Sequence, residues 1–391
     1  RIRSISRNQN RLHSIECTMN RLRISIGLLM ILFGLTTVTA KEDVKEQVLR
    51  LLQAETLRRA DAALESVPVT VTAAHAQRSA GGIHDFYSEG DYWWANPQDP
   101  DGPFIRRDGE TNPDNFTAHR HAMIRFSQLV GDLTSAWILT GDKKYTEAAM
   151  RHIRAWFVDQ ETMMNPNLLY AQAIKGIATG RGIGIIDTIH LIEVVQSLRL
   201  MEAQGIIEEK ELRTIRLWFS DYLTWMSTHR YGINEMEAKN NHGTCWTMQA
   251  AAFALFTQNK EMIHFCRERY RTVLLPNQMA ANGSFPLELE RTKPYGYSLF
   301  NLDAMTTLCH LLTTSEENLW DYTTTDGRNI EKGIAWLFPF VKDKNSWKHQ
   351  PDIMFWEEWP VAHPFSAAYI TTEKTTFRHG RSWNISLPMR K

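Results

Sequence analysis

The sequence predicts an all-α fold, an incomplete α/α toroid of paired antiparallel helices. Long segments place apolar residues three and four positions apart, which is the spacing of an amphipathic helix. No two runs of alternating apolar and polar residues are joined by a hairpin turn. Two helical pairs have similar connections, Leu139–Lys143 and Phe256–Lys260, as expected of helical hairpins that stack around one core.

The chain begins with the pattern of an export signal. Arginines precede the apolar run Ile24–Val38, and small residues follow it up to Ala40. The run is short for a membrane-spanning helix, so we expect a signal peptide cleaved near Ala40, and a secreted or periplasmic protein without stable membrane association. We therefore assign residues 1–40 to a leader and residues 41–391 to a single toroid domain.

Helical periodicity continues through most of the remaining chain. The first long segment carries Met123, Phe126, Val130 and Leu133, and Gly141 ends it. The predicted helices cover residues 117–140, 143–158, 184–204, 209–228, 243–258, 260–274, 298–313 and 328–341. The irregular stretches between helices are unusually long, and such loops commonly carry binding residues.

Charge and cysteine content narrow the possible functions. The 391 residues include 44 Lys+Arg and 44 Asp+Glu, which does not suggest a nucleic-acid-binding protein. Beyond the leader, 38 basic and 43 acidic residues remain, so an anionic partner requires a local cluster of cations. Of the four cysteines, Cys245, Cys266 and Cys309 lie beyond the leader. They are odd in number and widely spaced, which predicts buried thiols rather than disulfides or a metal site.

Two polar clusters stand directly before predicted helices. Residues 237–242 crowd Glu, Lys, two Asn and His into six positions, whereas a helix cap needs only one of them. In the second cluster, Arg291 has the planar fork that suits a carboxylate, and Tyr297 follows six residues later. Nearby cations favour the phenolate form of a tyrosine. Taken alone, either cluster is equally consistent with an ordinary cap, a core tyrosine or a surface ion pair.

A third candidate surface lies in the long stretch 81–116. Exposed aromatic residues stack on sugar rings and paired arginines bind carboxylates, although loop aromatics also serve simply as packing. This surface comprises Tyr92, Trp93, Trp94, Arg106 and Arg107. In contrast, His119 and His121 do not share a helix face, and no zinc, nucleotide or serine-hydrolase motif occurs at a matching site.

The strings Asn240–His242 and Leu287–Tyr297 together resemble the alginate lyase superfamily of α/α-toroid polysaccharide lyases. The longer strings 237–243 and Gly180–Gly184, with the loop at Tyr92, are closer to polysaccharide lyase family thirty-eight, which acts on glucuronan or alginate, than to family five. The likeness covers about residues 81–365.

This resemblance implies a catalytic set of Asn241, His242, Arg291 and Tyr297, with no metal or cofactor. The spacing from Arg291 to Tyr297 is one residue shorter than in family five, so Tyr295 is a second candidate for the tyrosine role. The implied partner is an anionic polysaccharide or oligosaccharide. Its binding residues are expected to be Tyr92, Trp93, Trp94, Arg106, Arg107, Tyr170, Gln172, Arg181, Lys239, Trp246, Glu288 and Tyr295.

These residue types suit β-elimination from a uronate. Removing the proton at C5 builds negative charge on the carboxylate, so fixed donors such as Arg291 and Asn241 must neutralise it. In β-D-mannuronate and β-D-glucuronate the C5 proton and the C4 leaving group lie on one side, so Tyr297 could act first as base and then as acid. His242 could bind the carboxylate, lower the pKa of the tyrosine or act as base on a C5 epimer.

Two other functions remain open from the sequence. A glycoside hydrolase would use two carboxylates, and a binding protein would grip the polymer without chemistry. The candidate carboxylates are Asp85, Asp91, Glu235, Glu237, Glu288 and Glu290. The sequence leaves open alginate versus glucuronan, endo versus exo cleavage, the oligomeric state and the role of residues 371–391.

Overall fold

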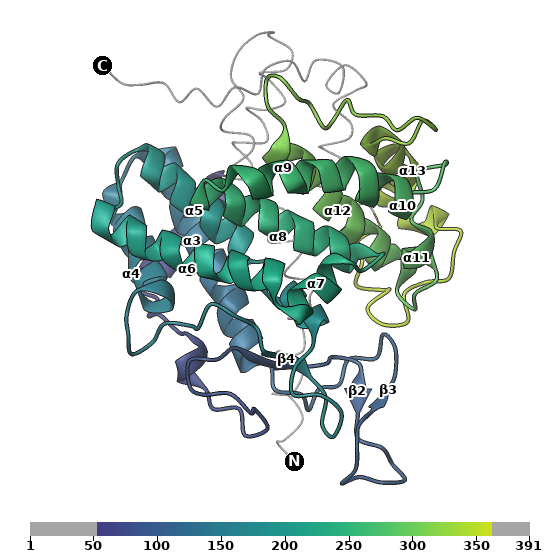
Figure 1. The fold of residues 1–391 in the computed structure, drawn as a ribbon, viewed down its shortest axis with the longest axis horizontal. Helices are drawn as coiled ribbons and strands as arrows, with labels where there is room; N and C mark the ends of the chain where they lie inside the picture. The colour runs from purple at the N-terminus through teal and green to yellow at the C-terminus, as the bar shows by residue number, and fades with distance from the viewer. Residues whose placement is uncertain (1–52, 362–391) are drawn as a thin grey trace.

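The computed structural model describes residues 53–361, and helices dominate this part of the chain (Figure 1). The predicted leader and the C-terminal residues 371–391 lie outside the described residues. The predicted all-α toroid of paired helices is confirmed. Its helices are residues 53–64, α3 (Ala118–Thr140), α4 (Lys143–Phe157), α5 (Leu191–Ala203), α6 (Glu209–Thr228), α7 (Arg230–Met236), α8 (Asn241–Thr257), α9 (Lys260–Arg269), α10 (Leu275–Gln278), α11 (Pro286–Leu289), α12 (Pro294–Leu312) and α13 (Ile330–Lys342).

The two similar connections seen in the sequence join helical hairpins in the same way. Gly141 ends α3 with a φ of 73°, and Asp142 then caps α4 by accepting a hydrogen bond from the amide of Lys144. Gln258 ends α8 with a φ of 59°, and Asn259 caps α9 likewise. A left-handed residue followed by a side-chain cap reverses the chain tightly, which explains why both sequences form hairpins.

Helix α8 is the central helix of the fold. It packs against α5, α6, α9 and α12, and its residues are buried on nearly every side. A helix that is apolar all round belongs in a core, and the run Ala250–Ala254 lets its neighbours approach closely. The predicted buried thiols are confirmed at Cys245, Cys266 and Cys309. Within residues 53–361, no helix is both long enough and apolar enough to span a bilayer.

Four short strands, which the sequence pattern did not predict, lie together beyond one end of the helices (Figure 1). Strand β1 (Tyr87–Glu89) pairs in parallel with β4 (Tyr170–Ala173), and β2 (Trp93–Trp94) pairs antiparallel with β3 (Ile105–Arg106). Strands of two to four residues are too short to show alternation. They bring the two irregular stretches of the sequence into contact.

Two predicted helices differ from the structure in their details. The segment predicted as 184–204 begins as a 3₁₀ helix, η2 (Gly182–Thr188), and only then becomes α5. The reason is close packing, because a Cβ atom on Gly184 would lie 2.5 Å from that of Ala171. The segment predicted as 260–274 ends in a π-helical turn, η3 (Tyr270–Leu274). Two further single turns are η1 (Val71–Ala73) and η4 (Lys344–Ser346).

Candidate active site

The structure brings Arg291, Tyr297 and Tyr92 together. Arg291 lies between α11 and α12, and Tyr297 lies in the first turn of α12, which Pro294 begins. The Arg291 Nη2 donates to the Tyr297 hydroxyl at 3.2 Å, and its guanidinium lies 4.2 Å from the centre of the ring. The Tyr92 hydroxyl, from the loop after β1, lies 2.6 Å from the Tyr297 hydroxyl. Two polar groups thus converge on one phenolic oxygen.

Tyr297 is a phenol in this environment. Burial raises its pKa, and although Arg291 and the Tyr92 hydrogen bond act to lower it, the net direction is upward. Asp108 and Asp91 also raise it. This modifies the expectation from the sequence, because cations do lie beside Tyr297 but do not outweigh the cost of placing a charge away from water.

Asp108 is a neighbour of Arg291 that the sequence did not single out. Its carboxylate accepts hydrogen bonds from Arg291 Nη2 at 3.1 Å and Nε at 3.4 Å, and from the Thr292 hydroxyl at 3.0 Å. Arg106 contacts it as well, at 2.5 Å. Nη1 of Arg291 is not buried and has no hydrogen-bond partner among the described residues, so this edge remains for a ligand.

Asn241 is sealed beneath the site by Glu288. Its backbone amide and its Nδ2 donate to the two oxygens of Glu288 at 2.6 and 2.8 Å, and both residues are almost fully buried. The position of Glu288 corrects the expectation that it contacts a substrate, because it holds the start of α8 instead. Asn241 Oδ1 is buried without a partner among the described residues. The Asn241 donors expected to face a uronate therefore face Glu288.

His242 reaches closer to the surface than Asn241. Its side chain is 18% exposed, and its Nδ1 lies 2.6 Å from the buried carboxylate of Glu235 in α7. Burial lowers the pKa of His242, but the charge and hydrogen bond of Glu235, together with Glu288, outweigh it and raise the pKa overall. Arg291 acts in the opposite direction, which shows that the imidazole and the guanidinium share one electrostatic environment.

The predicted aromatic and arginine residues of the loop form a single hairpin. Trp93 and Trp94 in β2 pair with Arg106 and Ile105 in β3. The Arg107 guanidinium lies 5.0 Å from the Trp94 ring, and the Arg107 amide donates to the Tyr92 carbonyl oxygen. The hairpin therefore carries aromatic rings and guanidinium groups close together, and these are suited to stacking on sugar rings and to binding carboxylates.

Arg181, which directly precedes η2 and whose amide donates to the Ala171 carbonyl oxygen of β4, lies beside this hairpin. Its guanidinium lies 5.8 Å from the Trp93 ring, and its Nε donates to the Gln172 carbonyl oxygen at 2.7 Å. Burial and the nearby Arg106 lower its pKa to about 10, so it stays charged at neutral pH. Gln172 has a φ of 53° and is mostly buried, so it positions Arg181 rather than facing a substrate. Tyr170 is half-buried at the start of β4.

Other predicted binding residues lie elsewhere. Trp246 is fully buried in α8, where its Nε1 donates to the Met226 carbonyl oxygen, and Tyr295 is buried with its hydroxyl bonded to the Phe340 carbonyl oxygen. Both are core residues, which corrects the expectation that they contact a substrate and leaves Tyr297 as the tyrosine of the site. Lys239 is exposed just before α8.

A buried charge network holds the loop that carries Tyr92. Arg120 in α3 contacts Asp91 at 2.5 Å and Asp187 at 3.4 Å, and Ser88 donates to Asp187. The Asp91 carbonyl oxygen accepts from the Asn112 amide. Arg120 therefore connects the central helices to the loop, a role that its position between two histidines did not reveal.

The carboxylates considered for a hydrolase are committed to other contacts or lie on the surface. Glu235 and Glu288 hold His242 and Asn241, and Asp91 pairs with Arg120. Asp85 accepts from the Gly82 amide and from Asn165, Glu237 contacts Arg269 while remaining 61% exposed, and Glu290 is exposed. Among residues 53–361, no group of three or more His, Cys, Asp or Glu side chains is placed to hold a metal ion.

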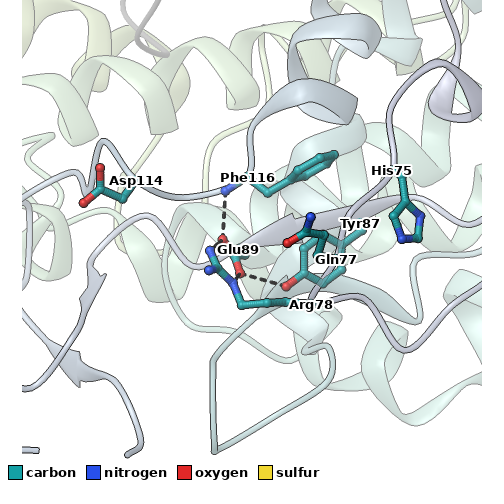
Figure 2. Close-up of a pocket in the computed structure, with 7 residues that line it drawn as sticks. All are labelled: His75, Gln77, Arg78, Tyr87, Glu89, Asp114 and Phe116. Atoms are coloured by element: carbon teal, nitrogen blue, oxygen red, sulfur yellow. Dashed lines mark hydrogen bonds and ion pairs between the residues drawn. The ribbon is translucent and has the colours of Figure 1, made fainter. Parts of the chain in front are cut away.

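Figure 2 shows a separate pocket of about 250 Å³. In it the Glu89 carboxylate accepts hydrogen bonds from Arg78, from the Tyr87 hydroxyl and from the Phe116 amide. These contacts lower the pKa of Glu89 in spite of its burial. None of the predicted site residues lines this pocket, so the convergence of charged groups at Arg291 and Tyr297, and not the hollow, identifies the site.

Comparisons with known proteins agree with this arrangement. The alginate lyase family model matches residues 70–347. A crystal structure of an alginate lyase from Bacteroides ovatus is 34% identical, with a TM-score of 0.73, over 78% of this chain and 81% of that chain. Two structures of variants of alginate lyase A1-III, each complexed with a tetrasaccharide, are 14% identical. The first has a TM-score of 0.52, and the match covers 76% of this chain and 79% of that chain. The second has a TM-score of 0.51, and the match covers 72% of each chain. At this identity the likeness concerns the fold alone. No curated protein matches the chain.

Proposed function

Because the chain belongs to the alginate lyase family and is a polysaccharide lyase, we propose that it cleaves a β-1,4-linked uronan by β-elimination. The observation that carries this proposal is the pair of hydrogen bonds on the Tyr297 hydroxyl, from Arg291 at 3.2 Å and with Tyr92 at 2.6 Å. A lyase needs a proton-transfer group beside a cation that binds a carboxylate, and this constellation supplies both.

In the proposed reaction, the free edge of Arg291 and the outer edge of His242 bind the uronate carboxylate. Their positive charge offsets the negative charge that develops when the C5 proton leaves. The Tyr297 phenolate accepts that proton, the electron pair of the C5–H bond forms the C4–C5 double bond, and the C4–O4 bond breaks. Tyr297 then returns the proton to O4 of the departing chain, so the residue is regenerated.

The environment of Tyr297 supports its role as base. A phenolate is costly in a buried position, which is why the pKa of Tyr297 is raised in the free enzyme. The Arg291 Nη2 and the Tyr92 hydroxyl are aimed at the oxygen on which the phenolate charge would reside. They are in place before the reaction and need no reorganisation, which is the condition for effective electrostatic stabilisation.

We further propose that the substrate is polymannuronate or glucuronan, as the resemblance of the sequence to polysaccharide lyase family thirty-eight implies. The hairpin of Trp93, Trp94, Arg106 and Arg107, extended by Arg181, would bind the sugar residues and carboxylates that flank the cleaved bond. The relatives named above are alginate lyases, which supports an anionic polysaccharide as the substrate. A secreted or periplasmic location, with residues 41–391 as one domain, suits a polymer substrate.

The test is product chemistry on polymannuronate, polyguluronate and glucuronan. We expect cleavage of polymannuronate or glucuronan to give an ultraviolet absorbance from the C4–C5 double bond, at one double bond for each new reducing end. New reducing ends without absorbance would identify a hydrolase, and retention of the polymer without shortening would identify a binding protein. Either result would refute β-elimination. Sizing the products distinguishes endo from exo cleavage.

A further inference from the structure

Within residues 53–361, the buried carboxylate of Glu235 has one hydrogen-bond partner, the imidazole of His242. Glu235 is 1% exposed, and its Oε1 lies 2.6 Å from Nδ1 of the imidazole. Its second oxygen, Oε2, is buried without a partner among the described residues. Burying a carboxylate with so few hydrogen bonds costs free energy of folding. Such groups are common where a catalytic side chain must be held in one protonation state.

The contact leaves one ring nitrogen of His242 for a substrate. Because a carboxylate accepts the Nδ1 proton, the ring is fixed in the orientation in which Nε2 is the outer nitrogen. Nε2 is not buried and has no partner within residues 53–361. If the ring is charged, Nε2 carries a proton and can donate to a uronate carboxylate. If it is neutral with Nδ1 protonated, Nε2 can only accept.

The charged groups around His242 favour the first state. Glu235 faces it from α7 and Glu288 from α11, and both raise the pKa of His242 against the effect of burial. Arg291, from the connection before α12, lowers it but does not reverse the direction. Glu235 also interacts electrostatically with Arg181 and acts to raise the pKa of that guanidinium. The removal of Glu235 would leave Glu288, already bonded twice to Asn241, as the main balancing charge.

We propose that Glu235 is a positioning residue: its carboxylate fixes the orientation of the His242 ring and keeps the imidazole protonated, so that His242 neutralises the substrate carboxylate while Tyr297 is the base. This inference rests on the proposed function and deepens it. It decides between the three roles that the sequence left open for His242. It also gives a function to a carboxylate that is too deeply buried to touch a substrate.

The proposal predicts a characteristic pH dependence. The active form has His242 protonated and Tyr297 ionised, so it carries one proton fewer than the form present in acid. Below the pKa of His242, the active fraction depends only on Tyr297. Above the pKa of His242, kcat/KM no longer rises with pH and reaches a plateau. Each unit by which the pKa of His242 is lowered reduces kcat/KM on this plateau tenfold. A variant that lowers this pKa should therefore lose activity at neutral pH but not in acid.

The experiment compares Glu235→Gln with wild type across the pH range. The amide keeps a hydrogen-bond acceptor for Nδ1 and removes only the charge. We expect the plateau of kcat/KM to fall at least tenfold, and the pH at which the acidic limb levels off to decrease by at least one unit. In acid the two enzymes should have the same kcat/KM. Glu237→Gln is the matched control, because Glu237 is two residues away and exposed. It should leave the profile unchanged.

A constant loss of activity at all pH values, or an unchanged profile, would overturn the proposal, since the first indicates only a structural role. An NMR titration of the wild-type imidazole nitrogens provides a test that needs neither activity nor a folded variant. The His242 resonance should show a protonated Nδ1 and a pKa above about 6.5. A pKa below that value would also overturn the proposal. Because this measurement involves no substrate, it fails or succeeds independently of the lyase assignment.

Discussion

At the scale of single residues, burial and charge pairing decide which groups are ionised. Tyr297 and Glu193 both have raised pKa values because they are buried, yet only Tyr297 has donors aimed at its oxygen. Glu193 in α5 has no hydrogen-bond partner among the described residues for either oxygen. A Cβ atom on Gly131 of α3 would lie 2.5 Å from its Oε1. Glu193 is therefore a neutral acid packed between two helices.

This state makes stability depend on pH. Burial, with a contribution from Asp132, raises the pKa of Glu193 to about 8 in the folded protein, against 4.5 as its ordinary value. As pH rises through this interval, the unfolded chain loses the proton and the folded chain does not, so the folded state becomes less stable. We expect Glu193→Gln to remove this loss of stability. The loss amounts to roughly 1.4 kcal/mol of unfolding free energy for each unit between the pKa of Glu193 in the folded protein and in the unfolded chain.

Urea unfolding at about pH 5 and pH 8 measures the effect. The difference in unfolding free energy between Glu193→Gln and wild type should increase in favour of the variant at the higher pH. Glu147→Gln, at an exposed position of α4, is the control and should follow wild type. If Glu193→Gln showed the same pH dependence as wild type, Glu193 would have to be ionised in the folded protein.

The sequence predicts some site residues well and others not at all, for a physical reason. Arg291 and Tyr297 are six residues apart at a helix start, so the local pattern indicates this pair. The sequence indicates Glu235 only as a candidate hydrolase carboxylate, and its contact with His242 comes from the structure. Asp108 is 183 positions away from Arg291 and reaches it only through the folded loop. In the sequence, Asp108 follows two arginines and resembles an ordinary surface charge. Nothing near it in the sequence indicates the contact with Arg291.

At the scale of elements, the segment Ile105–Thr111 is the part of the site most sensitive to backbone shape. Gly109 has a φ of +79°, and a Cβ atom there would lie 2.3 Å from Oγ1 of Thr292 and 2.8 Å from Cδ1 of Ile353. This close approach seats Asp108 against Arg291. The same segment donates from Arg107 to the Tyr92 carbonyl oxygen, so it also positions the Tyr92 hydroxyl.

We expect Gly109→Ala to lower kcat/KM by at least about tenfold, because a shift of the segment removes two partners of the Arg291–Tyr297 pair. The melting temperature should change by no more than a few degrees, since the segment lies outside the helical core. Gly205→Ala is a suitable control: Gly205 also has a positive φ, but nothing lies within 4 Å of the added methyl group. Wild-type activity in Gly109→Ala would show that the site does not depend on this segment.

The elements themselves differ in how far the sequence predicts them. The long helices follow from apolar periodicity, and the paired connections follow from Gly141-Asp142 and Gln258-Asn259. The strands could not be predicted, because β2 and β3 contain two residues each, and β1 pairs with β4 from a distant part of the chain. The split of 184–204 into η2 and α5 depends on packing of Gly184 against β4, which periodicity does not report.

At the scale of the whole molecule, the toroid brings together three separate parts of the chain. Helix α8 passes through the core and carries His242 at its start, and α12 beside it carries Tyr297 at its start. The stretch 90–111 reaches the α12 side through the contacts of Tyr92 with Tyr297 and of Asp108 with Arg291. The fold class, the two helix-bound motifs and the stretch 81–116 as a candidate binding surface are predictable from the sequence, whereas the contacts of that stretch with Arg291 and Tyr297 are not.

The most direct test of the account compares two tyrosines that are two residues apart. Tyr297→Phe removes the proposed base, while Tyr295→Phe removes a hydroxyl that donates to the Phe340 carbonyl oxygen in the core. We predict that Tyr297→Phe loses turnover by roughly 10³-fold or more, measured as double-bond absorbance, while calorimetry shows oligouronate binding within a few-fold of wild type. Tyr295→Phe should keep its activity. Full turnover by Tyr297→Phe would contradict the account.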